Sequence, residues 1–67
     1  MEWRDLIAVD PEIQRGRPVI KGTRVLVQVL VGSLAGGMTA EDVCEQYRVN
    51  EEQLRAALAY AAEALAE

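Results

Sequence analysis

The sequence predicts an α+β fold, mostly α, in which a short N-terminal β-ribbon precedes a three-helix bundle containing a helix-turn-helix. Turn formers and β-branched residues gather before residue 26, which favours strands and turns over residues 1–25. Apolar residues at helical spacing follow, which favours three helices over residues 26–67. The 67 residues suffice for one domain, so residues 1–67 are expected to fold as a single unit.

The ribbon is expected to contain two short strands. Leu6–Val9 is an apolar run closed by the turn signal Asp10-Pro11, and Val19-Ile20 is a second β-branched pair. The two strands pair either within one chain or between two copies. A lone two-stranded ribbon is marginal in water, and its free edges invite pairing with a second chain. The sequence therefore predicts self-association through this edge.

Four cations flank the second strand: Arg15, Arg17, Lys21 and Arg24, here called the basic edge. Pro18 fixes its own φ and favours an extended Arg17, while Gly22 can adopt a positive φ in a sharp turn. The basic edge either contacts phosphates, or is solvated or paired with Asp5, Asp10 and Glu12.

The first helix is predicted over Val27 to Ala35. The segment from Val25 to Leu34 is ambiguous, because its valines alternate as in a strand while Leu26, Leu30 and Leu34 recur at helical spacing. Gly36-Gly37 follows as a stop typical of helix C-termini. This stop favours the helix.

Two capped helices are predicted next. Thr39 with Asp42 forms a capping-box pattern, and Val43, Cys44 and Tyr47 are expected to face inward from the helix it begins. Asn50 can cap the last helix. That helix carries an apolar stripe made of Leu54, Ala57, Leu58, Ala61 and Leu65.

The short connection Arg48-Val49-Asn50 suggests a helix-turn-helix. Cys44 is small enough to face the second helix, Val49 fills the apolar position of the turn, and Arg48 stands where such units often have glycine. Any two packed antiparallel helices show the same pattern, so DNA readout and simple packing both remain open. The candidate DNA-contacting residues are Arg15, Arg17, Lys21, Arg24, Arg48, Gln53 and Arg55. The candidate partner-binding residues are Leu54, Leu58, Tyr60, Ala61 and Leu65.

Composition narrows the class of protein. Residues 1–37 carry five basic and four acidic residues, whereas residues 38–67 carry two basic and seven acidic ones, which suits a basic protein partner for the second half. One cysteine and no histidine predict no disulfide, no metal site and no cofactor, and fit a cytoplasmic location. We expect no membrane span. No catalytic residue is predicted, because the chain is too small to build a dry cleft alone.

Four segments resemble a known family, called domain of unknown function 433: Val9–Ile13, Gly16–Val25, Gly37–Val43 and Ala56–Ala61. The Gly-Arg-Pro-Val-Ile-Lys-Gly-Thr-Arg run is its specific part, and Tyr47-Arg48 departs from the family's frequent Tyr-Pro. The resemblance implies a homeodomain-like helix-turn-helix and a role as antitoxin of a type II toxin–antitoxin pair.

In such a pair the protein would bind and neutralise a nuclease toxin related to the PIN domain. It would also repress its own operon by binding operator DNA, as a homodimer or a higher oligomer. The alternative function is a protein-interaction or dimerisation module that binds no DNA.

Overall fold

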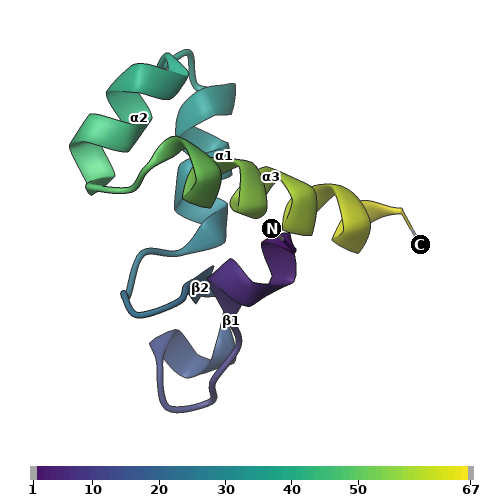
Figure 1. The fold of residues 1–67 in the computed structure, drawn as a ribbon. Helices are drawn as coiled ribbons and strands as arrows, with labels where there is room; N and C mark the ends of the chain where they lie inside the picture. Colours follow the sequence, from purple (N-terminus) through teal and green to yellow (C-terminus); the bar gives the residue numbers. More distant parts are fainter. Residues whose placement is uncertain (1, 67) are drawn as a thin grey trace.

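A computed structural model describes residues 2–66 as a two-stranded ribbon followed by three helices (Figure 1). The predicted α+β, mostly α architecture is therefore confirmed. In chain order the elements are η1 (Trp3–Leu6), β1 (Ile7–Ala8), η2 (Gln14–Gly16), β2 (Val19–Ile20), α1 (Val27–Ala35), α2 (Ala40–Tyr47) and α3 (Glu51–Leu65). The helices form the upper part of the molecule in Figure 1, with the ribbon below them.

The first strand is shorter than predicted. Leu6 ends a 3-10 turn, η1, and only Ile7 and Ala8 are in strand conformation. The turn forms because the Glu2 carboxylate accepts a hydrogen bond from the Arg4 amide, and because its side chains lie against α3. Trp3 packs edge-on against Tyr60, with ring centroids 6.2 Å apart.

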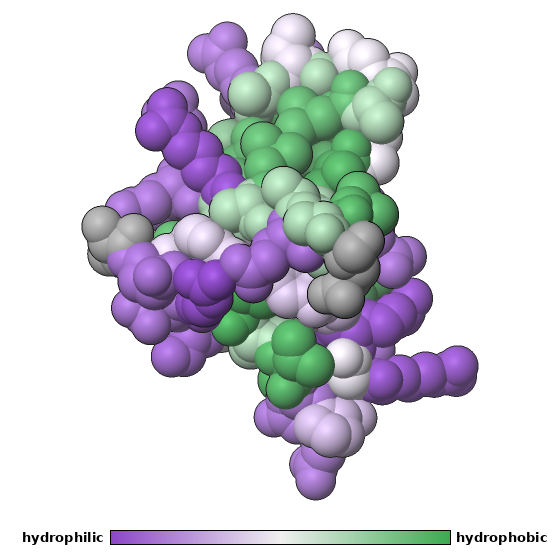
Figure 2. Space-filling view, turned by 90° about the vertical axis from the view of Figure 1, so that its right-hand side faces the viewer, coloured by the Kyte–Doolittle hydropathy of each residue, from purple (hydrophilic) through white to green (hydrophobic). Residues whose placement is uncertain are grey.

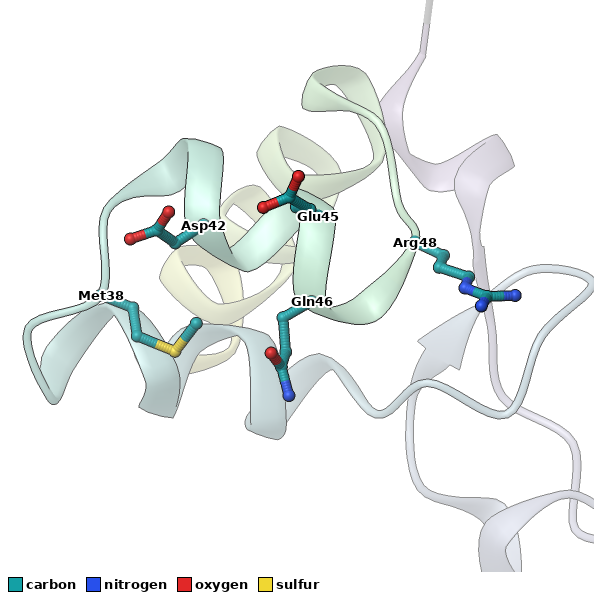
Figure 3. Close-up of a pocket in the computed structure, with 5 residues that line it drawn as sticks. All are labelled: Met38, Asp42, Glu45, Gln46 and Arg48. Atoms are coloured by element: carbon teal, nitrogen blue, oxygen red, sulfur yellow. The ribbon is translucent and has the colours of Figure 1, made fainter.

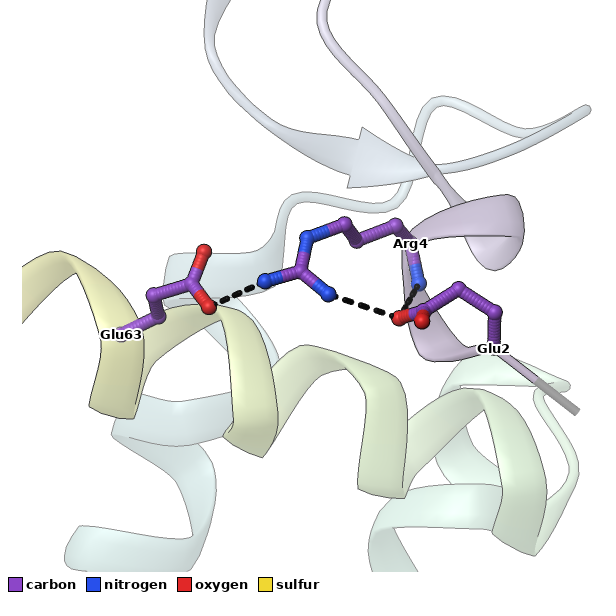
Figure 4. A network of polar contacts seen from close by, with 3 residues as sticks. All are labelled: Glu2, Arg4 and Glu63. Carbon is purple, nitrogen blue, oxygen red and sulfur yellow. Dashed lines mark hydrogen bonds and ion pairs between the residues drawn. The ribbon is translucent and has the colours of Figure 1, made fainter.

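An ion-pair network also attaches η1 to α3. The Arg4 guanidinium lies between Glu2, at 2.8 Å, and Glu63 near the end of α3 (Figure 4). It also covers the Trp3 ring, at 4.5 Å from the ring centroid. All three charged side chains are more than half exposed, so each pair contributes at most about 1 kcal/mol. The network mainly fixes where the N-terminal turn sits.

The ribbon forms within one chain. Ile7 pairs with Ile20 and Ala8 with Val19 in antiparallel register. On its other side β2 is bridged by Leu26, because the Ile20 amide donates to the Val25 carbonyl at 2.9 Å and the Val27 amide to the Pro18 carbonyl at 3.0 Å. With β2 bonded on both sides, the outer edge of the two-residue β1 is what remains for pairing with another chain.

The helix boundaries follow local signals. α1 spans the predicted range and is followed by Gly37, whose φ of 110° ends the helix as a glycine can. The Thr39 hydroxyl caps α2 by accepting from the Asp42 amide at 3.1 Å. Asn50 and Gln53 form a full capping box at the start of α3, in which each side chain accepts from the other residue's amide.

One core joins the ribbon to all three helices. Ile20, Leu30, Val43 and Ala57 are fully buried in it, and Val49 in the α2–α3 turn is 6% exposed. Fully burying a side chain such as Leu30 stabilises the fold by about 1.5–3 kcal/mol. Cys44 and Tyr47 pack against this cluster as predicted, and the Tyr47 hydroxyl is 3.0 Å from that of Ser33 on α1.

Candidate nucleic-acid and partner interfaces

The basic edge projects from both ends of β2. Val19 and Ile20 are fully buried, so the strand is anchored in the core while the flanking loops face solvent. Pro18 precedes the strand, and Arg17 before it is extended, with φ −75° and ψ 147°, as expected of a residue before proline. The four side chains at issue, Arg15, Arg17, Lys21 and Arg24, are all exposed.

The turn after β2 is tight and internally bonded. Gly22 has a φ of +82°, which glycine adopts without the strain of a side chain. The Thr23 hydroxyl donates to the Ile20 carbonyl at 2.7 Å and accepts from the Val25 amide at 3.0 Å. Thr23 therefore stabilises the turn, and Lys21 and Arg24 are held at its two ends.

The turn before β2 is left-handed, a conformation that was not predicted from the sequence. Gln14, Arg15 and Gly16 have φ values of 50°, 60° and 83°. A left-handed conformation costs roughly 1–2 kcal/mol for each residue that has a side chain. The Arg17 amide donates to the Gln14 carbonyl at 3.2 Å and closes this turn. Arg15 and Arg17 are thus presented on a strained loop.

The ion pairs found among residues 2–66 do not use the basic edge. They join Arg4 to Glu2 and Glu63, and Arg55 to Glu51. Asp10, which could have neutralised the edge, instead accepts a hydrogen bond from the Glu12 amide at 2.9 Å. Pairing of the basic edge with nearby carboxylates is therefore not found among residues 2–66, which leaves phosphate contact and simple solvation as the alternatives.

The other three candidate DNA contacts, Arg48, Gln53 and Arg55, differ in what their side chains contact. Arg48 is exposed in the α2–α3 turn. Gln53 accepts from the Asn50 amide at 2.8 Å and is part of the cap. Arg55 pairs with Glu51 at 3.4 Å. The N-terminal part of α3 is thus occupied by its own contacts and is acidic.

An apolar groove of about 420 Å³ lies between α1 and the C-terminal half of α3. Its walls include Val27, Val31 and Gly32 from α1, and Tyr60 and Ala61 from α3, and the lining residues found among residues 2–66 are all uncharged. Figure 2 shows the green surface of this region of α1 next to the paler, alanine-rich end of α3.

Three of the partner-binding candidates, Tyr60, Ala61 and Leu65, line this groove, whereas Leu54 and Leu58 do not. Leu54 is 2% exposed, so its assignment as a partner contact is wrong: α3 begins inside the core, and Leu54 belongs to it. Leu58 is 41% and Leu65 84% exposed, and Tyr60 and Ala61 are half-buried beside them. The stripe therefore leaves the core along the helix and becomes a free surface near its C-terminus.

A second hollow, about 500 Å³, runs along the outer side of α2 (Figure 3). Asp42 and Glu45 point away from Met38 and Gln46, and the Arg48 guanidinium extends away from both carboxylates. These polar groups diverge, so the hollow does not focus charge on one point as an active site does.

The described part of the chain was also compared with what a metal site and a membrane-spanning helix require. Within residues 2–66, no three His, Cys, Asp or Glu side chains lie close enough together to hold a metal ion. The helices described for these residues are too short or too polar to span a bilayer.

Comparison with known proteins places this geometry in a family. The chain is 36% identical over 59 residues to the uncharacterized protein y4eO of Sinorhizobium fredii (strain NBRC 101917 / NGR234), covering 87% of this chain and 27% of that protein. The X-ray structure of Rv2018 from Mycobacterium tuberculosis matches with a TM-score of 0.73 and 37% identity, over 84% of this chain and 27% of that one. The chain thus spans about a quarter of the length of these relatives. Residues 7–61 match the family described as protein of unknown function (DUF433), and the chain belongs to this family.

Proposed function

We propose that this chain is an antitoxin-like regulatory module with two separate binding surfaces. The basic edge, with Arg48 as a further exposed cation, holds the phosphate backbone of operator DNA. The α1–α3 groove, with Leu65 in its lining and the exposed Leu58 on the same helix, holds a nuclease-like toxin and neutralises it. Two copies would double the basic edge, as DNA-binding modules commonly do when they bind repeated half-sites.

The observation that carries this proposal is the freedom of the basic edge. Four cations lie on two neighbouring loops, and the ion pairs found among residues 2–66 involve only Arg4 and Arg55. Unpaired cations displace counterions from DNA when they meet phosphates, and this supplies sequence-independent affinity. The remaining surface of a chain with net charge −4 repels DNA, so binding would be confined to this edge.

The groove supports the second half of the proposal. Exposed apolar surface of this kind marks sites for protein partners. A toxin with a basic nucleic-acid site would also be attracted by the acidic second half of the chain, which carries seven of the eleven acidic residues.

A gel-shift assay tests the DNA-binding half. Duplex DNA from upstream of the gene is expected to be retained at low salt, alone or together with the neighbouring gene product. Replacing Arg17, Lys21 and Arg24 together by Ala should abolish the shift without changing the circular dichroism, because these side chains are exposed. Undiminished binding by the triple variant would place DNA on a different surface.

The rival function, a protein-interaction module without DNA binding, is favoured by α3. In a helix-turn-helix the second helix reads the major groove, but here its first turn carries Glu51 and Glu52, and Arg55 is paired. Absence of any shift at low salt, with the neighbouring product present, would select this function.

A further inference from the structure

We infer that Gln14 is a positioning residue that prearranges the basic edge for the phosphates of duplex DNA; this inference rests on the proposed function. Gln14 lies at the start of the left-handed turn, with φ 50°. A strained backbone persists only where surrounding contacts fix it, and such sites cluster where function requires a set geometry. The contacts of Gln14 show what is fixed here.

The side chain of Gln14 connects the two loops of the basic edge. Its amide nitrogen donates to the Arg24 carbonyl at 2.9 Å, across ten residues of sequence. The first loop presents Arg15 and Arg17, and the second presents Lys21 and Arg24. This bond therefore sets the separation between two pairs of cations.

The same residue also orients one guanidinium. The Arg17 Nε donates to the Gln14 carbonyl at 3.1 Å, and an Arg17 terminal nitrogen is 3.5 Å from the Gln14 side-chain oxygen. The terminal nitrogens of Arg17 keep hydrogen-bond capacity for a phosphate, since a guanidinium has five donors.

Gln14 suits this role because it is neutral. A carboxylate in its place would hold Arg17 more tightly but would cancel the charge that a phosphate recognises. The Gln14 backbone carbonyl holds the Arg17 Nε, and the neutral side-chain oxygen, 3.5 Å from a terminal nitrogen, leaves the full charge of the arginine available. Prearranged side chains lose less conformational entropy on binding, so the affinity rises without any additional contact to DNA.

The test uses Gln14→Gly, which removes the side chain while glycine tolerates a positive φ. Gln14→Asn serves as a second variant, because asparagine also accepts the left-handed conformation but is one methylene too short to keep the Arg24 bond. Gln46→Ala, an exposed glutamine on α2, is the matched control. Thermal melting monitored by circular dichroism first confirms that each variant is folded.

Binding to a fluorescent duplex is then measured from 25 to about 200 mM salt. We expect Gln14→Gly and Gln14→Asn to bind roughly 3- to 10-fold more weakly, with the salt dependence unchanged, because no phosphate contact is lost. Arg17→Ala should instead reduce the log–log slope by about 0.9, the contribution of one phosphate. Gln46→Ala should bind as the wild type does.

Each failure points to a different error. If the wild type binds no duplex, or the triple variant of the basic edge binds as well as the wild type, the proposed function is wrong and the inference fails with it. If the triple variant loses binding but both Gln14 variants bind like the wild type, the inference alone is wrong. A reduced slope in the Gln14 variants would also overturn it, because Gln14 would then be acting as a contact.

Discussion

Arg48 holds a left-handed backbone conformation, φ 57° and ψ 44°, at the C-terminus of α2. Its amide donates to the Cys44 carbonyl there, so the conformation ends the helix and turns the chain towards α3. Glycine is the residue that usually takes this position, because a side chain costs roughly 1–2 kcal/mol in it. Arg48, which stands where glycine is common in such units, therefore carries backbone strain that glycine would not have.

We expect Arg48→Gly to be more stable than Arg48→Ala by about 0.5–1 kcal/mol, since glycine relieves the strain but has a larger entropy in the unfolded chain. Both variants lose the same charge, so alanine is the matched control. For a domain of this size the difference corresponds to about 2–8 °C in thermal midpoint. Equal midpoints for the two variants would show that the left-handed conformation carries no strain.

Among the elements, α3 depends most clearly on its first turn. Asn50 and Gln53 satisfy each other's amides at 2.7 and 2.8 Å, and Leu54 enters the core directly afterwards. Removing the side chain of a capping residue typically costs about 1 kcal/mol. Asn50→Ala should therefore lower the thermal midpoint by about 4–8 °C.

Asn50→Asp is the control for this prediction, because a carboxylate keeps the acceptor and also favours the N-terminal end of the helix dipole. Its thermal midpoint should stay near that of the wild type. If the alanine and aspartate variants melt together, the cap is not what stabilises α3.

Elements determined by neighbouring residues could be predicted from sequence. The bounds of α1, the Thr39 and Asn50 caps and the strand at Val19-Ile20 all depend on signals within a few residues. The turns η1 and η2 could not be predicted in this way. The first depends on Trp3 and Arg4 meeting the far end of α3, and the second on Gln14 reaching Arg24.

The candidate site was predictable to the same degree. The basic edge is local in sequence, so its four residues could be named together. The apolar stripe of α3 could be identified as well, but the sequence pattern is the same whether a residue of the stripe is buried in the core or exposed to solvent. Only packing against the core separates Leu54, at 2% exposure, from Leu65, at 84%. Because α3 extends beyond the core that it packs against, the last apolar residues of its stripe are exposed to solvent.

In the whole molecule, the two surfaces use different side chains, so each can be disabled alone. The basic edge lies on the loops around β2, whereas the groove is lined by residues of α1 and α3 and by Pro18, which is the one lining residue from the loop that carries Arg17. The variant in which Arg17, Lys21 and Arg24 are replaced by Ala should lose DNA binding and still bind the neighbouring gene product. Changes at the groove should abolish binding of the neighbouring gene product and leave DNA binding intact.

Leu58→Asp combined with Leu65→Asp should abolish binding of the neighbouring gene product in calorimetry, because two carboxylates would be buried without partners on association. The fold should persist, since both leucines are exposed, and DNA retention should not fall. Val9→Asp is the matched control: Val9 is also an exposed large apolar residue, at 58%, but it does not line the groove. Equal losses from both changes would mean that added charge, and not the groove, governs the interaction.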